Sequence, residues 1–108
     1  MWICMNDAFL SIVKDKHSDR LLVRARRPHD ITTVFPQAAV IADAGTDYKY
    51  RAFVGRDEVA KAIADRLTSI DYTNFKNSVH DHGLHEAYAR FWHIMYALQK
   101  KIEDRGSQ

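Results

Sequence analysis

The feature that most constrains the fold is a change in the spacing of apolar residues near Gly55. Before this glycine, apolar residues alternate with polar ones or run in short stretches between polar turns, which is typical of β-strands. After it, apolar residues recur every three or four positions, which is the repeat of an amphipathic helix. Because strands come first and helices follow, the sequence predicts an α+β fold with helices packed on one face of a sheet.

The N-terminal part predicts a four-stranded, mostly antiparallel sheet made of two hairpins. A turn or bulge at Asn6-Asp7 is expected inside the first strand, and Gly45 supplies a permissive backbone in the second hairpin. Between the hairpins, Asp30 is expected to cap one helical turn that ends at Pro36. The predicted strands are residues 2–15, 20–27, 39–42 and 48–54.

Three helices are predicted after Gly55. The first starts near Asp57 and Glu58, where negative charge favours a helix N-terminus. Its apolar stripe is expected to contain Val59, Ile63, Leu67 and Ile70. Asp71 is expected to cap a short second helix, whose inward residues are Tyr72, Phe75 and Val79.

The strongest helical pattern follows Gly83, where six large apolar residues are spaced four, three, four, three and four apart. This spacing predicts a helix of about five turns with one continuous apolar face. Trp92 and Tyr96 lie beside that face and widen it. Because exposed aromatic residues are enriched at protein interfaces, a homodimer contact through Trp92 and Tyr96 is expected. The alternative is that the short preceding helix covers Trp92. The six residues are Leu84, Tyr88, Phe91, Met95, Leu98 and Ile102.

Length and composition predict one domain of ordinary size. The chain has 108 residues, of which 46% are hydrophobic and 28% are charged, with a net charge of +2. Residues 1–105 are expected to form a single α+β domain, and residues 106–108 a frayed tail. Cys4 is the only cysteine, which excludes an intramolecular disulfide. The sequence lacks a signal peptide pattern and a membrane-spanning apolar run, so a cytoplasmic protein without a membrane partner is expected.

A basic surface is predicted on one face of the sheet. Side chains two positions apart in a strand share a face, so Arg20, Arg24 and Arg26 are expected opposite the core residues Leu21 and Val23. If residues 20–27 pair with residues 48–54, the basic side chains of both strands lie beside the exposed ring of Phe53. Cations and a stacking ring suit nucleic acid, and the same cations suit an acidic protein surface. The alternative is a solvated face without a partner. The residues assigned to the surface are Arg20, Arg24, Arg26, Lys49, Arg51 and Phe53.

Three histidines, His80, His82 and His85, raise the alternative of a metal-binding protein or a metal-dependent enzyme. Imidazoles at these spacings are compatible with a zinc site, but the helical His-Glu-x-x-His motif is absent because Ala89 stands where its second histidine belongs. A solvated loop explains them more simply. No metal ligand or cofactor is therefore assigned.

A polar segment, residues 70–78, admits two interpretations. Asp71, Tyr72, Asn74 and Lys76 are suited to lining a small-molecule pocket, whereas helix capping explains Asp71 and Thr73 equally well and is preferred. The sequence contains no recognisable catalytic triad, phosphate-binding glycine loop or spaced carboxylate pair. No catalytic residue is assigned, and an enzyme is not expected.

Several stretches carry a resemblance to known sequences. They include Met1-Trp2-Ile3, Phe9-Leu10-Ser11-Ile12-Val13, Leu22-Val23-Arg24-Ala25-Arg26, Asp47-Tyr48-Lys49-Tyr50-Arg51-Ala52 and Ile70-Asp71-Tyr72-Thr73-Asn74-Phe75-Lys76. Over most of its length the chain resembles a group of short, uncharacterised bacterial proteins. The resemblance implies a free-standing cytoplasmic protein and no activity, cofactor or site. The sequence therefore predicts a non-enzymatic interaction module using the basic sheet face, with a metal-binding protein and a structural homodimer component as alternatives.

Overall fold

The computed structural model describes residues 1–43, 45 and 47–106, and it confirms the α+β class. The chain divides into two compact units, Met1–Tyr72 and Thr73–Gln108, each of which is described by itself below. The single domain expected over residues 1–105 stays a prediction. The expected turn at residues 43–47 includes Ala44 and Thr46, and the expected tail includes residues 107 and 108, which all lie outside the described residues.

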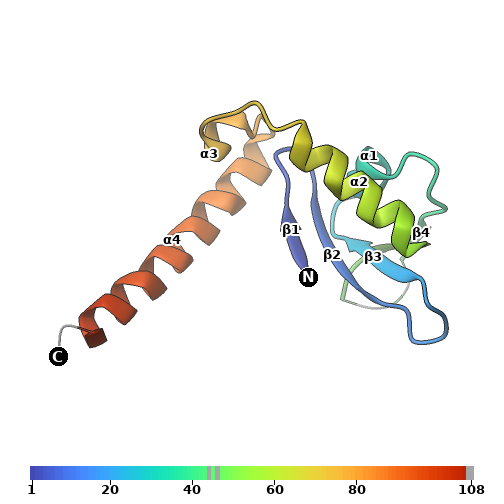
Figure 1. The fold of residues 1–108 in the computed structure, drawn as a ribbon, viewed down its shortest axis with the longest axis horizontal. Coiled ribbons are helices and arrows are strands. Elements are labelled where there is room, and N and C mark those ends of the chain that lie inside the picture. The colour runs from blue at the N-terminus through green and yellow to red at the C-terminus, as the bar shows by residue number, and fades with distance from the viewer. Residues whose placement is uncertain (44, 46, 107–108) are drawn as a thin grey trace. The chain divides into compact units, whose positions relative to one another are not determined.

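The first unit contains an open antiparallel sheet that has five strands within the described residues, in the order β1-β2-β3-β5-β4 (Figure 1). The prediction of four strands was wrong, because a turn at the expected position, Asn6-Asp7, divides residues 2–15 into two strands. The backbone N–H of Met5 donates to the carbonyl of Ala8 (2.8 Å) and closes a tight turn that reverses the chain. Both predicted hairpins are confirmed. The strands are β1 Trp2–Cys4, β2 Phe9–Lys14, β3 Leu21–Ala25, β4 Ile41–Ala42 and β5 Tyr50–Val54.

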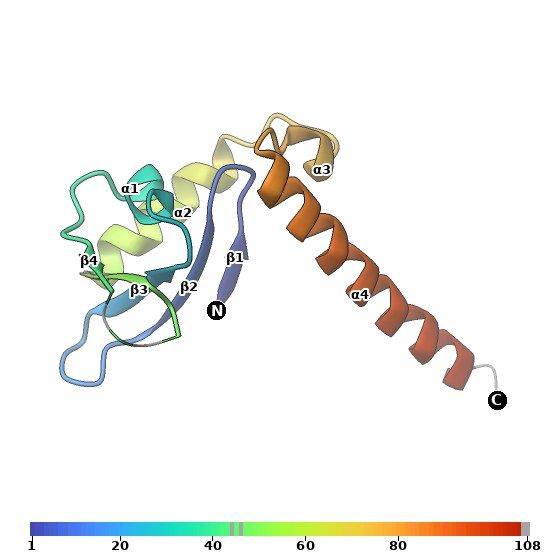
Figure 2. The same ribbon diagram turned by 180° about the vertical axis from the view of Figure 1, so that it is seen from behind.

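Helices α1 (Asp30–Val34) and α2 (Arg56–Thr68) share the core with one face of this sheet. The strands lie behind α2 in Figure 1 and in front of it in Figure 2. Val23 and Ala25 are fully buried, as their alternation predicts. Leu67, at 63% exposure, lies outside the core, and α2 ends before Ile70. The buried core residues from the sheet and both helices include Leu10, Ile12, Val23, Ala25, Ala52, Val54, Ile31, Val34 and Val59.

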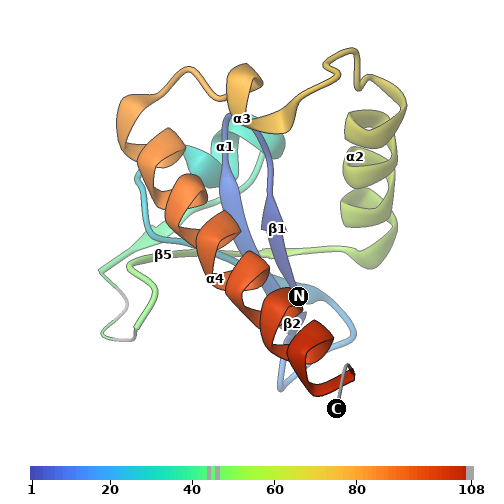
Figure 3. The ribbon, with the colours of Figure 1, turned by 90° about the vertical axis from the view of Figure 1, so that its left-hand side faces the viewer.

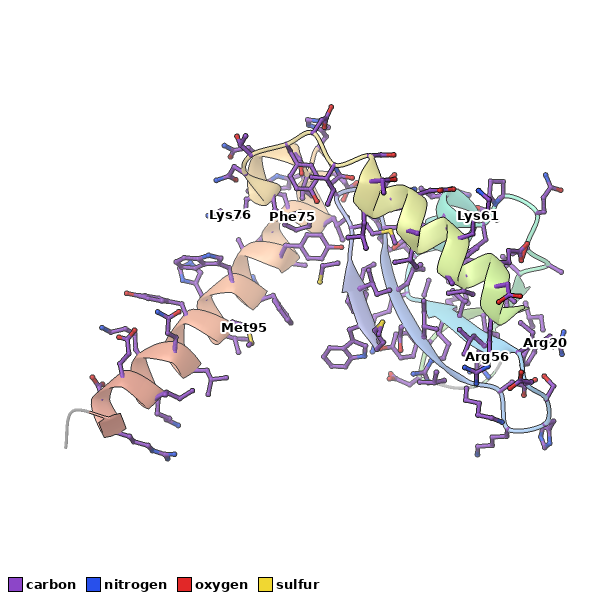
Figure 4. The ribbon with its side chains drawn as sticks, viewed as in Figure 1. Arg20, Arg56, Lys61, Phe75, Lys76 and Met95 are labelled. Carbon is purple, nitrogen blue, oxygen red and sulfur yellow. The ribbon has the colours of Figure 1, made fainter. Side chains whose placement is uncertain are left out.

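Polar contacts fix both ends of α2 to the loops of the sheet. Near its start, Nε of Arg56 donates to the carbonyl oxygen of Asp19 (2.7 Å). Near its end, Nη1 of Arg66 lies 2.6 Å from Oδ1 of Asp7 and Nη2 donates to the carbonyl of Thr33. Figure 4 shows Arg56 beside Arg20, which follows Asp19 in the β2–β3 loop. Both ends of the helix are therefore held above the core.

Asp30 has a different role from the helix cap that the sequence predicts. It is the first residue of α1, whose N-cap is His29, and its carboxylate is buried. Nη2 of Arg27 lies 2.7 Å from Oδ1 of Asp30, and the backbone N–H of Phe9 donates to Oδ2 (3.1 Å). The carboxylate therefore joins α1 to the start of β2 instead of capping the helix.

The second unit is a helical hairpin of α3 (Phe75–Ser78) and α4 (His82–Gly106), and α4 is one continuous helix (Figure 3). The expected cap at Asp71 was wrong, because Oδ1 of Asn74 accepts the capping hydrogen bond from the N–H of Asn77. The rings of Phe75 and Tyr88 lie 5.4 Å apart and join α3 to α4. The packing of α3 and α4 on the sheet stays a prediction.

Candidate functional site

The side of the sheet opposite α1 and α2, called the outer face here, contains the predicted basic surface. Strand β3 pairs with β5, as the prediction required. Directly opposite residues share a face, so one row crosses the sheet through Trp2, Ser11, Arg24, Arg51 and Ile41. A second row of three apolar residues lies beside it: Val13, Leu22 and Phe53. The predicted arginines therefore lie among apolar side chains on the same face of the sheet.

Arg24 is half-buried at the centre of the outer face. Its Nη2 donates to Oγ of Ser11 (2.7 Å), and its guanidinium lies 4.5 Å from the centroid of the Tyr48 ring. Within the described residues, its buried Nε has no hydrogen-bond partner. The direct contacts of this cation are thus with a hydroxyl and a ring. Neutral contacts orient the guanidinium, and among the described residues no carboxylate bonds to it.

Arg26 contacts the same ring but is paired with an acid. Its Nη1 and Nη2 lie 3.3 and 3.2 Å from the two carboxylate oxygens of Asp47, and its guanidinium lies 4.2 Å from the Tyr48 centroid. The hydrogen bond from Arg26 lowers the pKa of Asp47 and raises that of Arg26. The charge of Arg24 also contributes to the low pKa of Asp47. Asp47 therefore neutralises one edge of the basic surface.

Arg20 and Lys49, at the margins of the surface, are also paired with acids. Nη2 of Arg20 lies 3.7 Å from Oδ2 of Asp15, while its guanidinium lies 4.9 Å from the centroid of Phe53. Nζ of Lys49 lies 3.5 Å from Oδ1 of Asp43. The outer face consequently has less net positive charge than the row of basic residues in the sequence indicates.

Sequence reasoning missed two members of this site. Tyr48 was not assigned to the basic surface, but its ring contacts Arg24 and Arg26 because it precedes β5 and does not follow that strand's alternation. Ser11 is fully buried and was not singled out. A small polar residue between Phe9 and Val13, on the same face as Arg24, was the available signal.

A titration of Asp47 tests the Arg26 contact. Because Arg26 holds the folded-state pKa of Asp47 below its usual value of 3.8, the pair's stabilisation is present above this value and is lost as pH falls through the folded-state pKa. In the Arg26→Gln variant, the Asp47 pKa is expected to rise toward the usual value. Carboxyl-carbon NMR shifts against pH measure it directly. Equal titration midpoints of Asp47 in the parent and in Arg26→Gln would contradict the ion pair between Arg26 and Asp47.

The histidine segment does not converge into a metal site. His82 is almost fully exposed in the first turn of α4, with Nε2 4.0 Å from Oε2 of Glu86. His80 is exposed and His85 is half-buried. Among the described residues, no group of three or more His, Cys, Asp and Glu side chains is arranged to hold a metal ion. This segment therefore carries no metal proposal.

A small cavity of about 200 Å³ lies between the β1–β2 turn and the end of α2. Asp71 and Tyr72 line it, together with Cys4, Arg66 and Ile70, whereas Asn74 and Lys76 are not part of its lining. Burial raises the pKa of the Cys4 thiol. The volume is below the roughly 300 Å³ at which small-molecule pockets begin, and Arg66 is already bonded to Asp7. The cavity does not support a small-molecule site.

The predicted dimer residues lie together on α4. The rings of Trp92 and Tyr96 stack with centroids 5.2 Å apart and are 49% and 45% exposed. Nζ of Lys76, on α3, lies 5.4 Å from the centroid of the Trp92 ring. The short helix therefore contacts Trp92 through one side chain and leaves about half of its surface uncovered.

No helix of the described residues is both long and apolar enough to cross a membrane. No protein-family model, curated protein or solved structure matches the chain.

Proposed function

We propose that the protein is a non-catalytic binding module whose outer sheet face recognises a protein segment carrying a carboxylate among apolar side chains. One observation carries the proposal: Arg24 is held at the centre of that face by Ser11 and Tyr48, and no carboxylate of the described residues is bonded to it. An arginine fork that is already oriented loses little side-chain entropy when it binds a carboxylate. Arg24 is therefore the anchor of the proposed contact.

The neighbours of Arg24 also favour an acidic ligand. Arg51 lies directly opposite it in the β3–β5 pair, and like charges placed directly opposite each other are unfavourable. A carboxylate bound to Arg24 would offset this repulsion. Charge-assisted hydrogen bonds of this kind contribute about 1.5–3 kcal/mol each.

The composition of the face favours a protein over a nucleic acid. Trp2 is 65% exposed and Phe53 is 37% exposed, and both lie in the rows that cross Arg24 and its neighbours. Protein interfaces combine arginine with aromatic and aliphatic side chains in this way. Binding to phosphate backbones depends instead on many unpaired cations, whereas Arg20, Arg26 and Lys49 are paired with carboxylates here.

Selection of peptides on the immobilised full chain tests the proposal. Peptides from a random library are expected to share an Asp or Glu flanked by apolar residues. The affinity of one selected peptide is then measured by calorimetry for the parent and for variants. Arg24→Gln is expected to weaken binding about tenfold or more, equivalent to about 1.4 kcal/mol.

Two further variants sharpen the test. Asp47→Asn removes the carboxylate that competes for Arg26 and acts on Arg24, so it is expected to tighten binding several-fold. Arg105→Gln removes an exposed arginine from the last turn of α4 and is expected to leave the affinity unchanged. Selected peptides without acidic residues, or equal affinities for the parent and Arg24→Gln, would overturn the proposal. Tighter, salt-dependent binding of a thymidine 20-mer would assign the face to nucleic acid instead.

A further inference from the structure

The middle of α4 is apolar over more than half of its circumference. Between Phe91 and Leu98, His93 is the only ionisable residue other than Tyr96. At 100° per residue, the apolar side chains of this segment cover an arc of about 200°. A helix this apolar is normally buried. Seven of its large side chains are instead between 43% and 66% exposed: Phe91, Trp92, Ile94, Met95, Tyr96, Leu98 and Ile102, which are called the exposed α4 face here.

Among the described residues of the second unit, the first part of the helix's apolar stripe is the buried part. Leu84 and Tyr88 are buried, and the ring of Tyr88 contacts Phe75 on α3. Beyond Tyr88 the same stripe continues through Phe91, Met95, Leu98 and Ile102, as Figure 4 illustrates at Met95. Residues 91–102 extend over roughly 18 Å of helix at 1.5 Å per residue. The stripe therefore continues well beyond the point where α3 stops covering it.

We infer that the exposed α4 face binds the same face of a second copy of this chain, forming a helix-to-helix homodimer. Spacing of four and three residues is the repeat with which like helices pack their apolar edges together. Each of the seven side chains leaves on the order of 100 Å² exposed, or roughly 700 Å² per copy, close to the roughly 800 Å² per partner of a stable interface.

The charges that flank this face favour a second copy over a lipid surface. Glu86 and Arg90 form an ion pair before it, and Lys100 and Glu103 form another at its C-terminal end. Helices that lie on membranes carry a polar face rich in lysine and arginine, whereas the polar residues of α4 are of both signs. Balanced charges at both ends also allow two identical helices to approach without net repulsion. The inference depends on α4 alone and is independent of the function proposed for the sheet.

The Met95→Glu variant tests the dimer. Met95 is 48% exposed within one copy, so glutamate there should leave the fold intact, and glutamate is a good helix former. In a dimer, Met95→Glu would bury the carboxylate charge of one copy beside the same charge of the other copy. Sedimentation equilibrium is expected to give a dimer for the parent at micromolar concentration and a dissociation constant at least about 100-fold weaker for Met95→Glu.

Ala97→Glu is the matched control, because it places the same side chain two positions away on the opposite side of the helix, whereas the ring of His93 contacts Trp92. This variant is expected to keep the parent's dissociation constant. Leu98→Glu is expected to weaken the dimer as Met95→Glu does. The inference is overturned if the parent is a monomer at 100 µM, if Met95→Glu has the parent's mass, or if Ala97→Glu dissociates equally. A monomeric parent that binds phosphatidylcholine–phosphatidylserine vesicles would assign the face to lipid and overturn it as well.

Discussion

Replacing Leu10 with alanine is expected to lower the free energy of unfolding by about 3–5 kcal/mol. Leu10 is fully buried on β2, between β1 and β3, and belongs to the core shared by the sheet, α1 and α2. The truncation removes its hydrophobic transfer energy and leaves a cavity that neighbours on three elements cannot fill by a small shift. A loss of this size is a large part of the stability of most small proteins.

Urea denaturation followed by circular dichroism measures the effect. Val13→Ala is the matched control, because Val13 lies on the same strand but on the outer face and is 36% exposed. The free energy of unfolding of Val13→Ala is expected to fall by about 1 kcal/mol or less, since aliphatic truncations outside a core create no cavity. Similar losses for the two variants would show that the core does not lie on the Leu10 side of the sheet.

Removing the buried carboxylate of Asp30 is expected to cost about 2–4 kcal/mol. In Asp30→Ala, the guanidinium of Arg27 loses its bonded anion, and the backbone N–H of Phe9 loses its acceptor beside the core. The cost arises mainly from the backbone N–H of Phe9, since burying an unsatisfied polar group is unfavourable, and from the lost ion pair of Arg27, which keeps its hydrogen bond to the carbonyl of Asp7. Because these bonds join α1 to the sheet, the loss should appear as a lower denaturation midpoint of the first unit.

The corresponding surface control is Asp65→Ala. Asp65 pairs with Lys61 on the exposed side of α2, and both side chains are more than half exposed, so the expected change is within about 0.5 kcal/mol. Asp30→Asn keeps one carbonyl acceptor for the N–H of Phe9. Its stability should therefore lie between those of Asp30→Ala and Asp65→Ala. If Asp30→Ala unfolds at the same urea concentration as Asp65→Ala, the buried pair does not stabilise α1.

The sequence determined the features that depend on residues close together in the chain. Alternation identified the buried side of β3, where Val23 and Ala25 have no exposed surface. Helical spacing located α4, and its apolar residues beyond Tyr88 are exposed on one face. These features follow from local geometry, because the side-chain period is two residues in a strand and 3.6 in a helix.

The extra strand shows where this local reasoning ends. The turn between β1 and β2 contains neither glycine nor proline, and residues 2–15 form a largely continuous apolar stretch. A reversal of the chain in such a stretch is stabilised by the ladder that β1 forms with β2, including the pairing of Trp2 with Ser11. The energy of that ladder depends on tertiary context more than on residue propensities.

Charge partners were decided only by the tertiary structure. The sequence placed Arg24, Arg26 and Arg51 on one face, but it did not pair Arg26 with Asp47, 21 positions away. The sequence predicted that Asp30 caps a helix, whereas in the fold the backbone N–H of Phe9 donates to the carboxylate of Asp30. Hydrogen bonds and ion pairs require atoms within about 3–4 Å, and only the folded path of the backbone brings distant residues that close. Residue spacing therefore decides which side of an element is buried, whereas the fold decides which charges on the other side are already neutralised.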